Sequence, residues 1–268
     1  MIKVLFIGDI FGNLGRKAIN SHLKSLKREY QADFCIVNGE NAAAGRGITK
    51  KIASEFYSAG ADCITMGNHT WGRNDIVDFI DEDEKMVRPA NYSKNVPGKG
   101  SRIITNSNDK KIGVVNVLGR VYMDGCDCPF EAIEREIEYL KQDVKIVIVD
   151  IHAEATSEKS AIAWDFDGRV SAVLGTHTHV QTADERILPF GTAFLTDVGM
   201  TGPYDGIIGV DRKIIIKKFK TGMPQRFEPA LGKAQINGVY LEIDEKTGKA
   251  LKIERINMKD IDLNEVKG

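Results

Sequence analysis

The amino-acid sequence predicts an α/β fold with mixed sheets. Short apolar runs alternate with amphipathic segments along most of the chain, which is the pattern of strands that alternate with helices. Most of these runs are apolar throughout, as expected for parallel strands that are buried on both faces. Two runs near the C-terminus, residues 238–244 and 249–256, instead alternate around a turn and predict an antiparallel hairpin.

The composition is that of a globular protein. Of the 268 residues 42% are hydrophobic and 28% are charged, and the formal net charge of -1 gives no overall electrostatic reason to bind nucleic acid or membranes. No run of about 18 apolar residues occurs and the N-terminus lacks the form of a signal peptide, so we expect no membrane contact and a cytoplasmic location. Cys35 and Cys63 are expected to be buried thiols. Cys126 and Cys128 lie in a predicted loop and lack the second cysteine pair that a zinc site needs.

The first half of the chain predicts three buried strands with helices between them. Residues 2–8, 34–37 and 63–66 are these strands. Apolar residues at helical spacing, from Ile19 to Tyr30, predict a surface helix after the first strand. Thr49 is suited to cap a helix after the second strand, and Asn74 is suited to cap one after the third.

The middle of the chain continues the same alternation. Residues 102–105, 111–118, 145–150, 170–174 and 192–196 predict five further strands. Pro129 fits the first turn of a helix whose apolar stripe continues to Leu140, and another helix is expected after Ser157.

The C-terminal part is less regular. Residues 201–235 are expected to form an irregular insertion, in which Asp211 could cap a short helix that runs to Phe219, although residues 214–216 are equally typical of a strand. Residues 236–258 predict the C-terminal hairpin, and the polar last dozen residues are expected to fray. Because no repeat or flexible linker divides the chain, residues 1–268 are expected to form a single domain.

Polar side chains that can ligate metals follow five of the predicted strands. Only His22, of the chain's five histidines, lies elsewhere. The residues at the strand ends are Asp9, Glu40, Asn41, Asn68, His69, His152, His177 and His179. Ligands of α/β sheets bind at the carboxyl ends of the strands, where parallel strands would bring these groups together. If residues 177–179 stay extended, the two histidines at their ends point to the same side.

Each of these residues also has an ordinary structural interpretation. The alternatives are a helix cap for Asp9, turns for Glu40, Asn41 and Asn68, a hydrogen-bonded core position for His152, and a surface loop for His177 and His179. That all of them fall at strand ends by chance is the weaker explanation. Carboxylate, amide and imidazole groups together suit iron, manganese or zinc. They exceed what one tetrahedral ion needs, but they suffice for two ions that share a bridging carboxylate.

In their order along the chain these residues resemble the signature of the calcineurin-like metallophosphoesterases. The specific parts are Gly-Asn-His at residues 67–69 and Gly-x-His-x-His at residues 175–179, and the match covers the chain from Met1 to about Gly199. Two positions depart from the usual pattern, because Phe11 stands where a histidine is usual and Glu40 stands where the bridging aspartate is usual. Both departures, together with residues 200–206, resemble the bacterial YmdB-like branch, which is similar over essentially the whole length.

The resemblance implies a four-layer α/β/β/α sandwich of the metallophosphoesterase type with mixed sheets. It implies two metal ions per chain, with iron as the first choice and manganese or zinc as alternatives. It also implies phosphodiesterase activity on small phosphodiesters, notably 2′,3′-cyclic nucleotides such as 2′,3′-cyclic AMP, and that Asn41 takes the place of the missing histidine.

Our hypothesis is a hydrolase in which a hydroxide that bridges the two metals attacks phosphorus in line. One ion would be held by Asp9, Glu40, Asn41 and His179, and the other by Glu40, Asn68, His152 and His177. Because His69 follows Asn68 directly, an extended backbone would turn it away from the ions and toward the leaving group. His69 would then act as the general acid.

Two other functions are compatible with the sequence. The same metals could support a phosphomonoesterase or a 5′-nucleotidase-like activity, because loops rather than metal ligands set the substrate. Alternatively, the chain could be a metal-containing regulatory protein that contacts RNA through a basic patch, although such a charge run is most often a solvated face. The patch consists of Arg212, Lys213, Lys217, Lys218 and Lys220. The sequence leaves open whether the protein forms a homo-oligomer.

Overall fold

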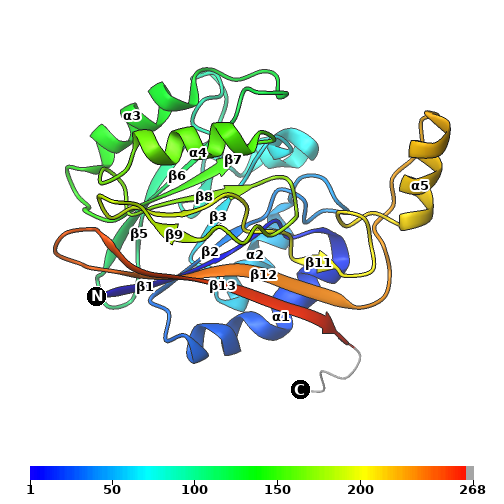
Figure 1. Ribbon diagram of the computed structural model, residues 1–268, viewed down its shortest axis with the longest axis horizontal. Helices are drawn as coiled ribbons and strands as arrows, with labels where there is room; N and C mark the ends of the chain where they lie inside the picture. Colours follow the sequence, from blue (N-terminus) through cyan, green and yellow to red (C-terminus); the bar gives the residue numbers. More distant parts are fainter. Residues whose placement is uncertain (264–268) are drawn as a thin grey trace.

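The computed structural model describes residues 1–263 of the chain. Two β-sheets pack face to face, and helices cover the outer face of each sheet (Figure 1). The arrangement is the predicted four-layer α/β/β/α sandwich.

The first sheet has seven strands and is parallel in its N-terminal part. Its order is β11 (Gly202–Pro203), β12 (Ala234–Ile243), β1 (Ile2–Ile7), β2 (Phe34–Asn38), β3 (Cys63–Thr65) and β4 (Met86–Val87), with β13 (Ala250–Ile261) paired to β12. Strands β1 to β4 run parallel to one another. Strand β12 lies antiparallel to β1, β11 and β13, so the chain returns to the first strand from the far end of the sequence.

The second sheet has six strands and a parallel centre. Its order is β5 (Ser101–Thr105), β6 (Lys111–Leu118), β7 (Val147–His152), β8 (Ala172–Thr176), β10 (Ala193–Leu195) and β9 (Arg186–Ile187). Strands β6, β7, β8 and β10 are parallel, and the two edge strands β5 and β9 are antiparallel to their neighbours.

Strand β1 shows why these runs are apolar throughout. Leu5 and Ile7 face the helices in one buried cluster, whereas Val4 and Phe6 face the second sheet in another. Both faces of the strand are therefore inside the protein, and side chains that alternate between the faces are apolar on each.

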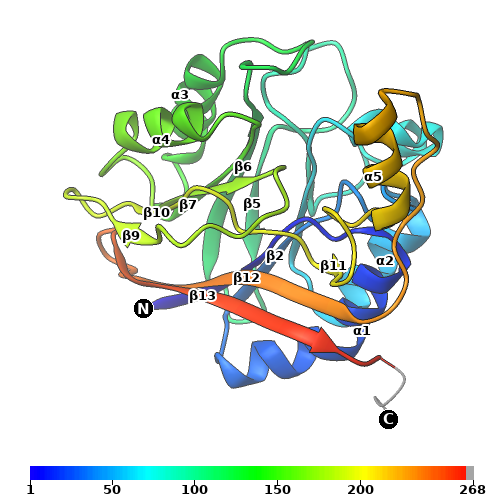
Figure 2. The ribbon, with the colours of Figure 1, turned by 45° about the vertical axis from the view of Figure 1, so that its right-hand side comes forward.

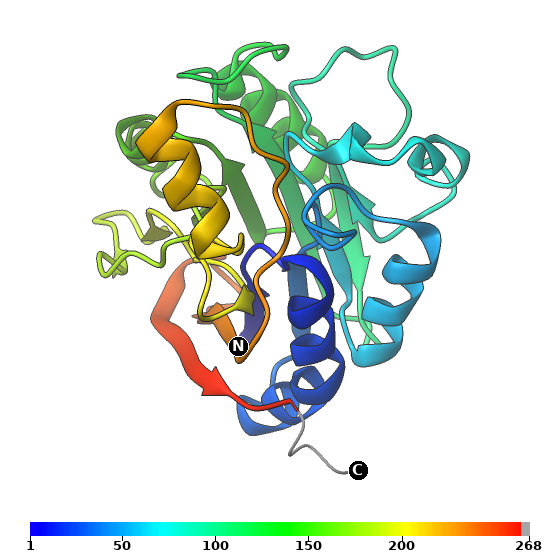
Figure 3. The same cartoon turned by 90° about the vertical axis from the view of Figure 1, so that its right-hand side faces the viewer.

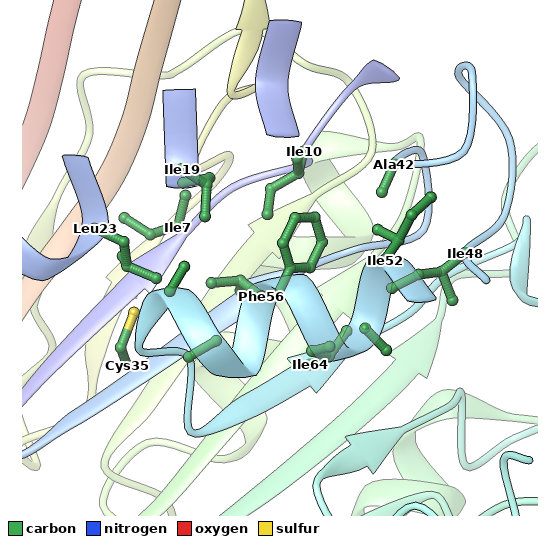
Figure 4. Packing of buried hydrophobic residues seen from close by; sticks show 14 of the residues in the cluster. Ile7, Ile10, Ile19, Leu23, Cys35, Ala42, Ile48, Ile52, Phe56 and Ile64 are labelled. Carbon is green, nitrogen blue, oxygen red and sulfur yellow. The ribbon is translucent and has the colours of Figure 1, made fainter. Parts of the chain in front are cut away.

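Four helices form the outer layers. Helices α1 (Gly12–Glu29) and α2 (Lys50–Ala59) cover the first sheet, and Phe56 of α2 packs among the aliphatic side chains there (Figure 4). Helices α3 (Pro129–Leu140) and α4 (Thr156–Asp165) cover the second sheet. Thr49 caps α2 by accepting a hydrogen bond from the backbone N–H of Ile52, as predicted.

Two local predictions were wrong. The segment after β3 forms two short 3-10 helices, η1 (Thr70–Gly72) and η2 (Asn74–Asp78), and Asn74 lies inside the second one instead of capping a longer helix. The strand predicted over 170–174 is shifted and continues through Gly175 to Thr176. A side chain at Gly175 would collide with the carbonyl of Thr196 on the neighbouring segment, so the glycine permits a close backbone contact and does not end the strand.

The C-terminal region is more ordered than predicted. Asp211 caps helix α5 (Arg212–Thr221) by accepting hydrogen bonds from two backbone N–H groups, so the strand alternative for this segment was wrong. Strands β12 and β13 pair beyond both ends of the predicted hairpin, and β13 continues to Ile261. Part of the segment expected to fray is therefore a paired strand, while its residues 264–268 lie outside the described residues.

No helix among residues 1–263 is both long and apolar enough to cross a membrane. The four cysteines are free thiols, and Cys35 and Cys63 are buried as expected.

Candidate metal centre

The predicted ligands converge where the two sheets meet. Asp9, Glu40 and Asn68 follow the parallel strands β1, β2 and β3 of the first sheet, whereas His152 and His177 come at the ends of β7 and β8 in the second. Strands β1, β2 and β3 are parallel to one another, and so are β7 and β8. The carboxyl ends of the strands in each sheet therefore lie at one edge, and these residues lie together there. The edge is the one predicted from the sequence.

His152 lies at the centre of one group of side chains. Its Nε2 is 3.0 Å from Glu40 Oε1, 3.0 Å from Asn68 Oδ1 and 3.1 Å from His177 Nδ1. Glu40, His152 and His177 therefore present ligand atoms close enough together to hold one ion. His152 and Glu40 are buried, so water does not screen the interaction between charges on their side chains.

A second group shares Glu40 with the first. Asn41 Nδ2 is 3.0 Å from Glu40 Oε1 and 3.2 Å from His179 Nε2. His179 Nε2 is in turn 4.0 Å from Asp9 Oδ1. Since rotation of the Asn41 amide exchanges its oxygen and nitrogen, either atom can face the centre of this group.

Hydrogen bonds behind His152 orient its ring. The ring Nδ1 is 2.9 Å from Thr176 Oγ1, and the threonine hydroxyl donates to Asp150 Oδ1 at 2.6 Å. Because the Thr176 hydroxyl gives its hydrogen to the Asp150 carboxylate, its oxygen accepts the hydrogen bond from His152 Nδ1–H. Nε2 of His152 is then left to face Glu40 and Asn68. Metal-ligating histidines are commonly oriented in this way.

The other two histidines are held similarly. His177 Nε2 lies 3.1 Å from Glu154 Oε2, which leaves Nδ1 of His177 facing His152. His179 Nδ1 donates to the carbonyl oxygen of Ile208 at 3.0 Å, so its Nε2 faces Asp9. Each of the three imidazoles thus directs a single nitrogen into the site.

The loop that carries His177 and His179 is not extended. Both residues have left-handed backbone conformations, with φ of 97° and 67°. The prediction that alternation along a strand aims the two side chains was therefore wrong, although both reach the site. Non-glycine residues rarely adopt this conformation, and surrounding contacts must stabilise it.

A buried ion pair between Lys159 and Asp197 forms hydrogen bonds with this loop. Lys159 of α4 donates to Asp197 Oδ2 at 2.7 Å and to the carbonyl of Thr176 at 2.7 Å. The same Asp197 oxygen accepts bonds from both the backbone N–H and the hydroxyl of Thr178, which stands between the two histidines. Lys159 and Asp197 are completely buried.

The electrostatics of the centre favour a positive charge beside Glu40. Burial alone would raise the pKa of Glu40, but the neighbouring His152 and His69 outweigh this effect and hold the pKa at about 2. Burial alone would lower the pKa of His152, but the carboxylates of Glu40, Asp9 and Asp150 raise it to about 9. Burial lowers the pKa of His177 to about 3, helped by His152, so its imidazole is neutral and able to ligate.

Two observations show that the residues fit a bound metal ion. Asp9 Oδ1 is buried and has no hydrogen-bond partner among residues 1–263, which is costly unless a cation satisfies it. A Cβ atom at Gly67 would come within 2.3 Å of Glu40 Oε2 and 2.5 Å of His152 Nε2. The missing side chain at Gly67 therefore keeps open the space in which the ligand atoms meet.

His69 borders the centre without joining the main cluster. Its backbone N–H donates to Glu40 Oε2 at 2.8 Å, and its ring is partly buried. The backbone of His69 has φ of -94° and ψ of 15°, so the expected extended conformation was wrong. Burial lowers the pKa of the His69 imidazole, an effect that Glu40 partly opposes.

Sequence reasoning missed the supporting residues around the histidines. These are Asp150, Glu154, Lys159, Thr176 and Asp197. Asp150 ends the strand predicted over 145–150 and Asp197 follows the one predicted over 192–196, a signal that could have identified them. Lys159 lies on a helix and has no comparable signal, because most helical lysines are solvated.

The chain matches known proteins over nearly its whole length. The family described as "YmdB-like protein" matches residues 5–256. A protein of Bacillus subtilis (strain 168) named 2′,3′-cyclic-nucleotide 2′-phosphodiesterase is 51% identical over 259 residues, which cover 97% of this chain and 98% of that protein. A putative phosphatase/phosphodiesterase of Mycoplasma genitalium is 41% identical, with 96% of this chain and 93% of that protein covered.

Two crystal structures share the fold at 40% identity. A hypothetical protein from Thermus thermophilus superposes with a TM-score of 0.90, with 97% of this chain and 100% of that chain covered. A structure described as a novel phosphatase from Mycoplasma pneumoniae also has a TM-score of 0.90, with 97% and 94% covered. The family match, the shared sequence and the shared fold lead to one conclusion: the chain belongs to the YmdB-like family of the calcineurin-like metallophosphoesterases.

Proposed function

We propose that this protein is a metal-dependent phosphodiesterase that hydrolyses 2′,3′-cyclic nucleotides such as 2′,3′-cyclic AMP. The observation that carries the proposal is the set of three oriented imidazoles around Glu40. His152 contacts Glu40 directly, His177 contacts His152, and His179 lies against Asn41, which itself contacts Glu40. The name of the Bacillus relative supports the substrate class.

In this proposal Glu40 belongs to both halves of a dinuclear centre. Asp9, Glu40, Asn41 and His179 hold one ion, and Glu40, Asn68, His152 and His177 hold the other. The contacts support this division, since Asn68 and His177 lie near His152, whereas Asn41 lies near His179. A mixed set of oxygen and nitrogen ligands suits iron, and manganese and zinc are the alternatives. Bound ions would supply a hydroxide at neutral pH and neutralise the phosphoryl oxygens.

The reaction adds water across one ester bond of the cyclic phosphate. An oxygen from water joins phosphorus, the bond between phosphorus and O2′ breaks, and O2′ receives a proton. The product is then a 3′-nucleotide, in agreement with the "2′-phosphodiesterase" in the name of the Bacillus relative.

His69 is the proposed donor of that proton, because a bound phosphate would oppose the effect of burial and favour the protonated imidazole. Its backbone is fixed on Glu40 and its ring lies beside the centre, where it can reach a leaving group that is not bound to metal. Trp71 and Tyr92 pack together nearby, and the Tyr92 hydroxyl lies 3.4 Å from the carbonyl of Gly67. Both rings are partly exposed, and in this proposal they stack against the nucleobase.

A substrate panel tests the proposed function. Protein loaded anaerobically with iron or manganese is assayed against 2′,3′-cyclic and 3′,5′-cyclic mononucleotides, cyclic dinucleotides, bis-para-nitrophenyl phosphate and para-nitrophenyl phosphate. We expect 2′,3′-cyclic nucleotides to have the highest kcat/KM and the product to be the 3′-monophosphate. Faster turnover of para-nitrophenyl phosphate than of every diester would contradict the proposal and favour a phosphomonoesterase, the activity suggested by the word phosphatase in the Mycoplasma names.

A further inference from the structure

Residues 211–228 leave the body of the protein as an arm that carries α5, which projects to the right in Figure 1 and is turned toward the viewer in Figures 2 and 3. The arm is closed at its base, where the backbone N–H of Asp211 donates to the carbonyl of Glu228 at 2.9 Å and Val210 bridges Pro229. Ile215 is the buried residue of α5 and packs in a small cluster with Phe11. The arm is therefore anchored at one end, and most of the surface of α5 is exposed.

The base of this arm touches the metal centre. The carbonyl of Ile208, three residues before Asp211, accepts the hydrogen bond that orients His179. The ring of Phe11, which packs against the arm, is also 5.7 Å from the His179 ring in an edge-to-face contact. A ligand that lies along α5 can therefore begin at the catalytic site.

The charge of the arm differs from that of the rest of the protein. Between its two base residues, Asp211 and Glu228, the arm contains six of the chain's 37 Lys and Arg residues and no other Asp or Glu. The six are Arg212, Lys213, Lys217, Lys218, Lys220 and Arg226. None of them forms an ion pair with a carboxylate anywhere in residues 1–263. The remainder of the chain is net acidic, so the arm is a local site for an anion.

Aromatic rings lie among these cations. Phe219 is 77% exposed and Phe227 is 48% exposed. The ammonium group of Lys218 lies 4.6 Å from the centre of the Phe227 ring. Cations that track a phosphate backbone, interleaved with exposed rings on which bases stack, are the features that bind single-stranded nucleic acid.

We propose that the α5 arm binds single-stranded RNA whose 3′ end carries a 2′,3′-cyclic phosphate, and that it delivers this end to the metal centre. The inference rests on the proposed function, because a 2′,3′-cyclic phosphate needs a ribose 2′-oxygen and exists in RNA only at a 3′ terminus. Helix α5 is about 15 Å long, which is sufficient to contact more than one phosphate. The RNA substrate of the protein would be the product of reactions that cleave RNA by attack of a 2′-hydroxyl on the adjacent phosphate.

A second copy of the chain is the competing occupant, because Ile216 and Met223 of the arm are also exposed. The combination of six cations with two exposed aromatic rings favours RNA, because RNA offers phosphates to the cations and bases to the rings of Phe219 and Phe227.

A binding experiment tests the arm apart from catalysis. Fluorescence anisotropy measures the Kd of a labelled single-stranded RNA of about eight nucleotides, ending in a 3′-phosphate, at several salt concentrations. The arm variant combines Lys213→Gln, Lys217→Gln and Lys220→Gln, and the control combines Lys24→Gln, Lys111→Gln and Lys246→Gln, which are exposed lysines on other elements. We expect the arm variant to lower the slope of log Kd against log salt by about 2 and the control to keep the wild-type slope.

Stacking has its own variant in the same experiment. Phe219→Ala is expected to weaken RNA binding by about fivefold or more and to leave the salt slope unchanged, because no charge is removed. Equal affinities of wild type, arm variant and Phe219→Ala would overturn the proposal.

Turnover then links the arm to the metal centre. The measured quantity is the ratio of kcat/KM for the same RNA ending in a 2′,3′-cyclic phosphate to kcat/KM for 2′,3′-cyclic AMP. We expect this ratio to fall at least about tenfold in the arm variant and to stay unchanged in the control. An unchanged ratio in the arm variant would contradict delivery of RNA by α5.

The outcomes also separate the two proposals. If neither substrate is hydrolysed but the salt-dependent binding remains, the proposed function fails while the RNA contact is supported. If the arm variant changes the mass found by light scattering from oligomer to monomer and leaves RNA affinity unchanged, α5 contacts a second copy of the chain and the proposal is overturned.

Discussion

Glu40 contacts both groups of polar side chains in the centre, while His69 is attached to it only through a backbone N–H. This difference separates the residues that would hold metal from the residue that would act on substrate. It leads to opposite expectations for their variants, since removal of a ligand weakens metal binding whereas removal of a proton donor leaves the metals in place.

His69→Ala should keep its metal content and lose activity in a way that depends on the leaving group. A positioned general acid contributes about 10²–10⁴ in rate, so kcat for 2′,3′-cyclic AMP should fall by that order. The loss should be smaller for bis-para-nitrophenyl phosphate, because para-nitrophenolate needs less protonation. His22→Ala, on the outer helix α1, serves as the control. Loss of metal, or an equal defect with both substrates, would exclude the general-acid role.

Gly67→Ala tests the space in which the ligands meet. The added methyl group would collide with Glu40 and His152, so metal affinity should fall by at least about tenfold. Gly125→Ala is the matched control, because a Cβ at Gly125 meets no atom within 4 Å and any strain comes from its positive φ alone. Titration calorimetry with Mn²⁺ measures both variants. Equal affinity of Gly67→Ala and wild type would show that the space beside Gly67 is not the metal site.

At the scale of secondary-structure elements, the loop after β8 depends on helix α4. The left-handed His177 and His179 are held between the end of β8 and the Lys159–Asp197 pair, and the ammonium of Lys159 also bonds the carbonyl of Thr176. Asp197 comes just after β10, so helix α4, the end of β8 and the residues after β10 together fix one short loop.

Lys159→Met should therefore be strongly destabilising. It leaves the buried Asp197 carboxylate without its cation, a change that typically costs about 3–5 kcal/mol of unfolding free energy. Urea unfolding of the metal-free protein measures the effect, with Lys24→Met on the exposed face of α1 as the control. A loss below about 1 kcal/mol would mean that the ion pair does not stabilise the loop.

Elements that are defined by local patterns were predicted well from the sequence. Buried runs such as residues 2–8 and the Thr49 cap depend on neighbouring residues only, and the structure confirms both. The shift of β8 through Gly175 could not be predicted, because it depends on contact with Thr196 in another segment. The 3-10 turns near Asn74 were missed for a related reason, since a helical pattern of apolar residues does not distinguish a regular helix from short turns.

The candidate site was predictable to the extent that it lies at strand ends. Parallel strands bring Asp9, Glu40 and Asn68 to one edge whatever the loops do. The backbone conformation of His177 and the role of Lys159 are tertiary properties, which the sequence pattern does not contain.

At the scale of the whole molecule, the layer between the sheets joins both halves of the chain. Phe6 of β1 lies in this layer with side chains from β7, β8 and β10. If one sheet unfolded, the apolar inner face of the other sheet would be exposed to water. The candidate metal centre lies where the two sheets meet, and its geometry depends on their packing. We therefore predict a single domain that unfolds as one unit.

The two tryptophans report on opposite sides of this layer. Trp71 packs against the cluster of the first sheet, whereas Trp164 is on α4 above the second. In single-tryptophan variants, Trp71→Phe and Trp164→Phe, the fluorescence transitions in urea should have the same midpoint. Adding Phe6→Ala should lower the unfolding free energy by about 3–5 kcal/mol in both. Separate midpoints would indicate two independently folding units.

The central claim is that Glu40 is shared by two metal ions. Elemental analysis of protein loaded anaerobically with iron or manganese and freed of excess metal tests it directly. We expect two ions per chain in the wild type, about one in Asn68→Ala and in Asn41→Ala, and fewer than one in Glu40→Gln. A wild-type content of at most one ion per chain, or a Glu40→Gln variant that keeps two, would contradict the claim.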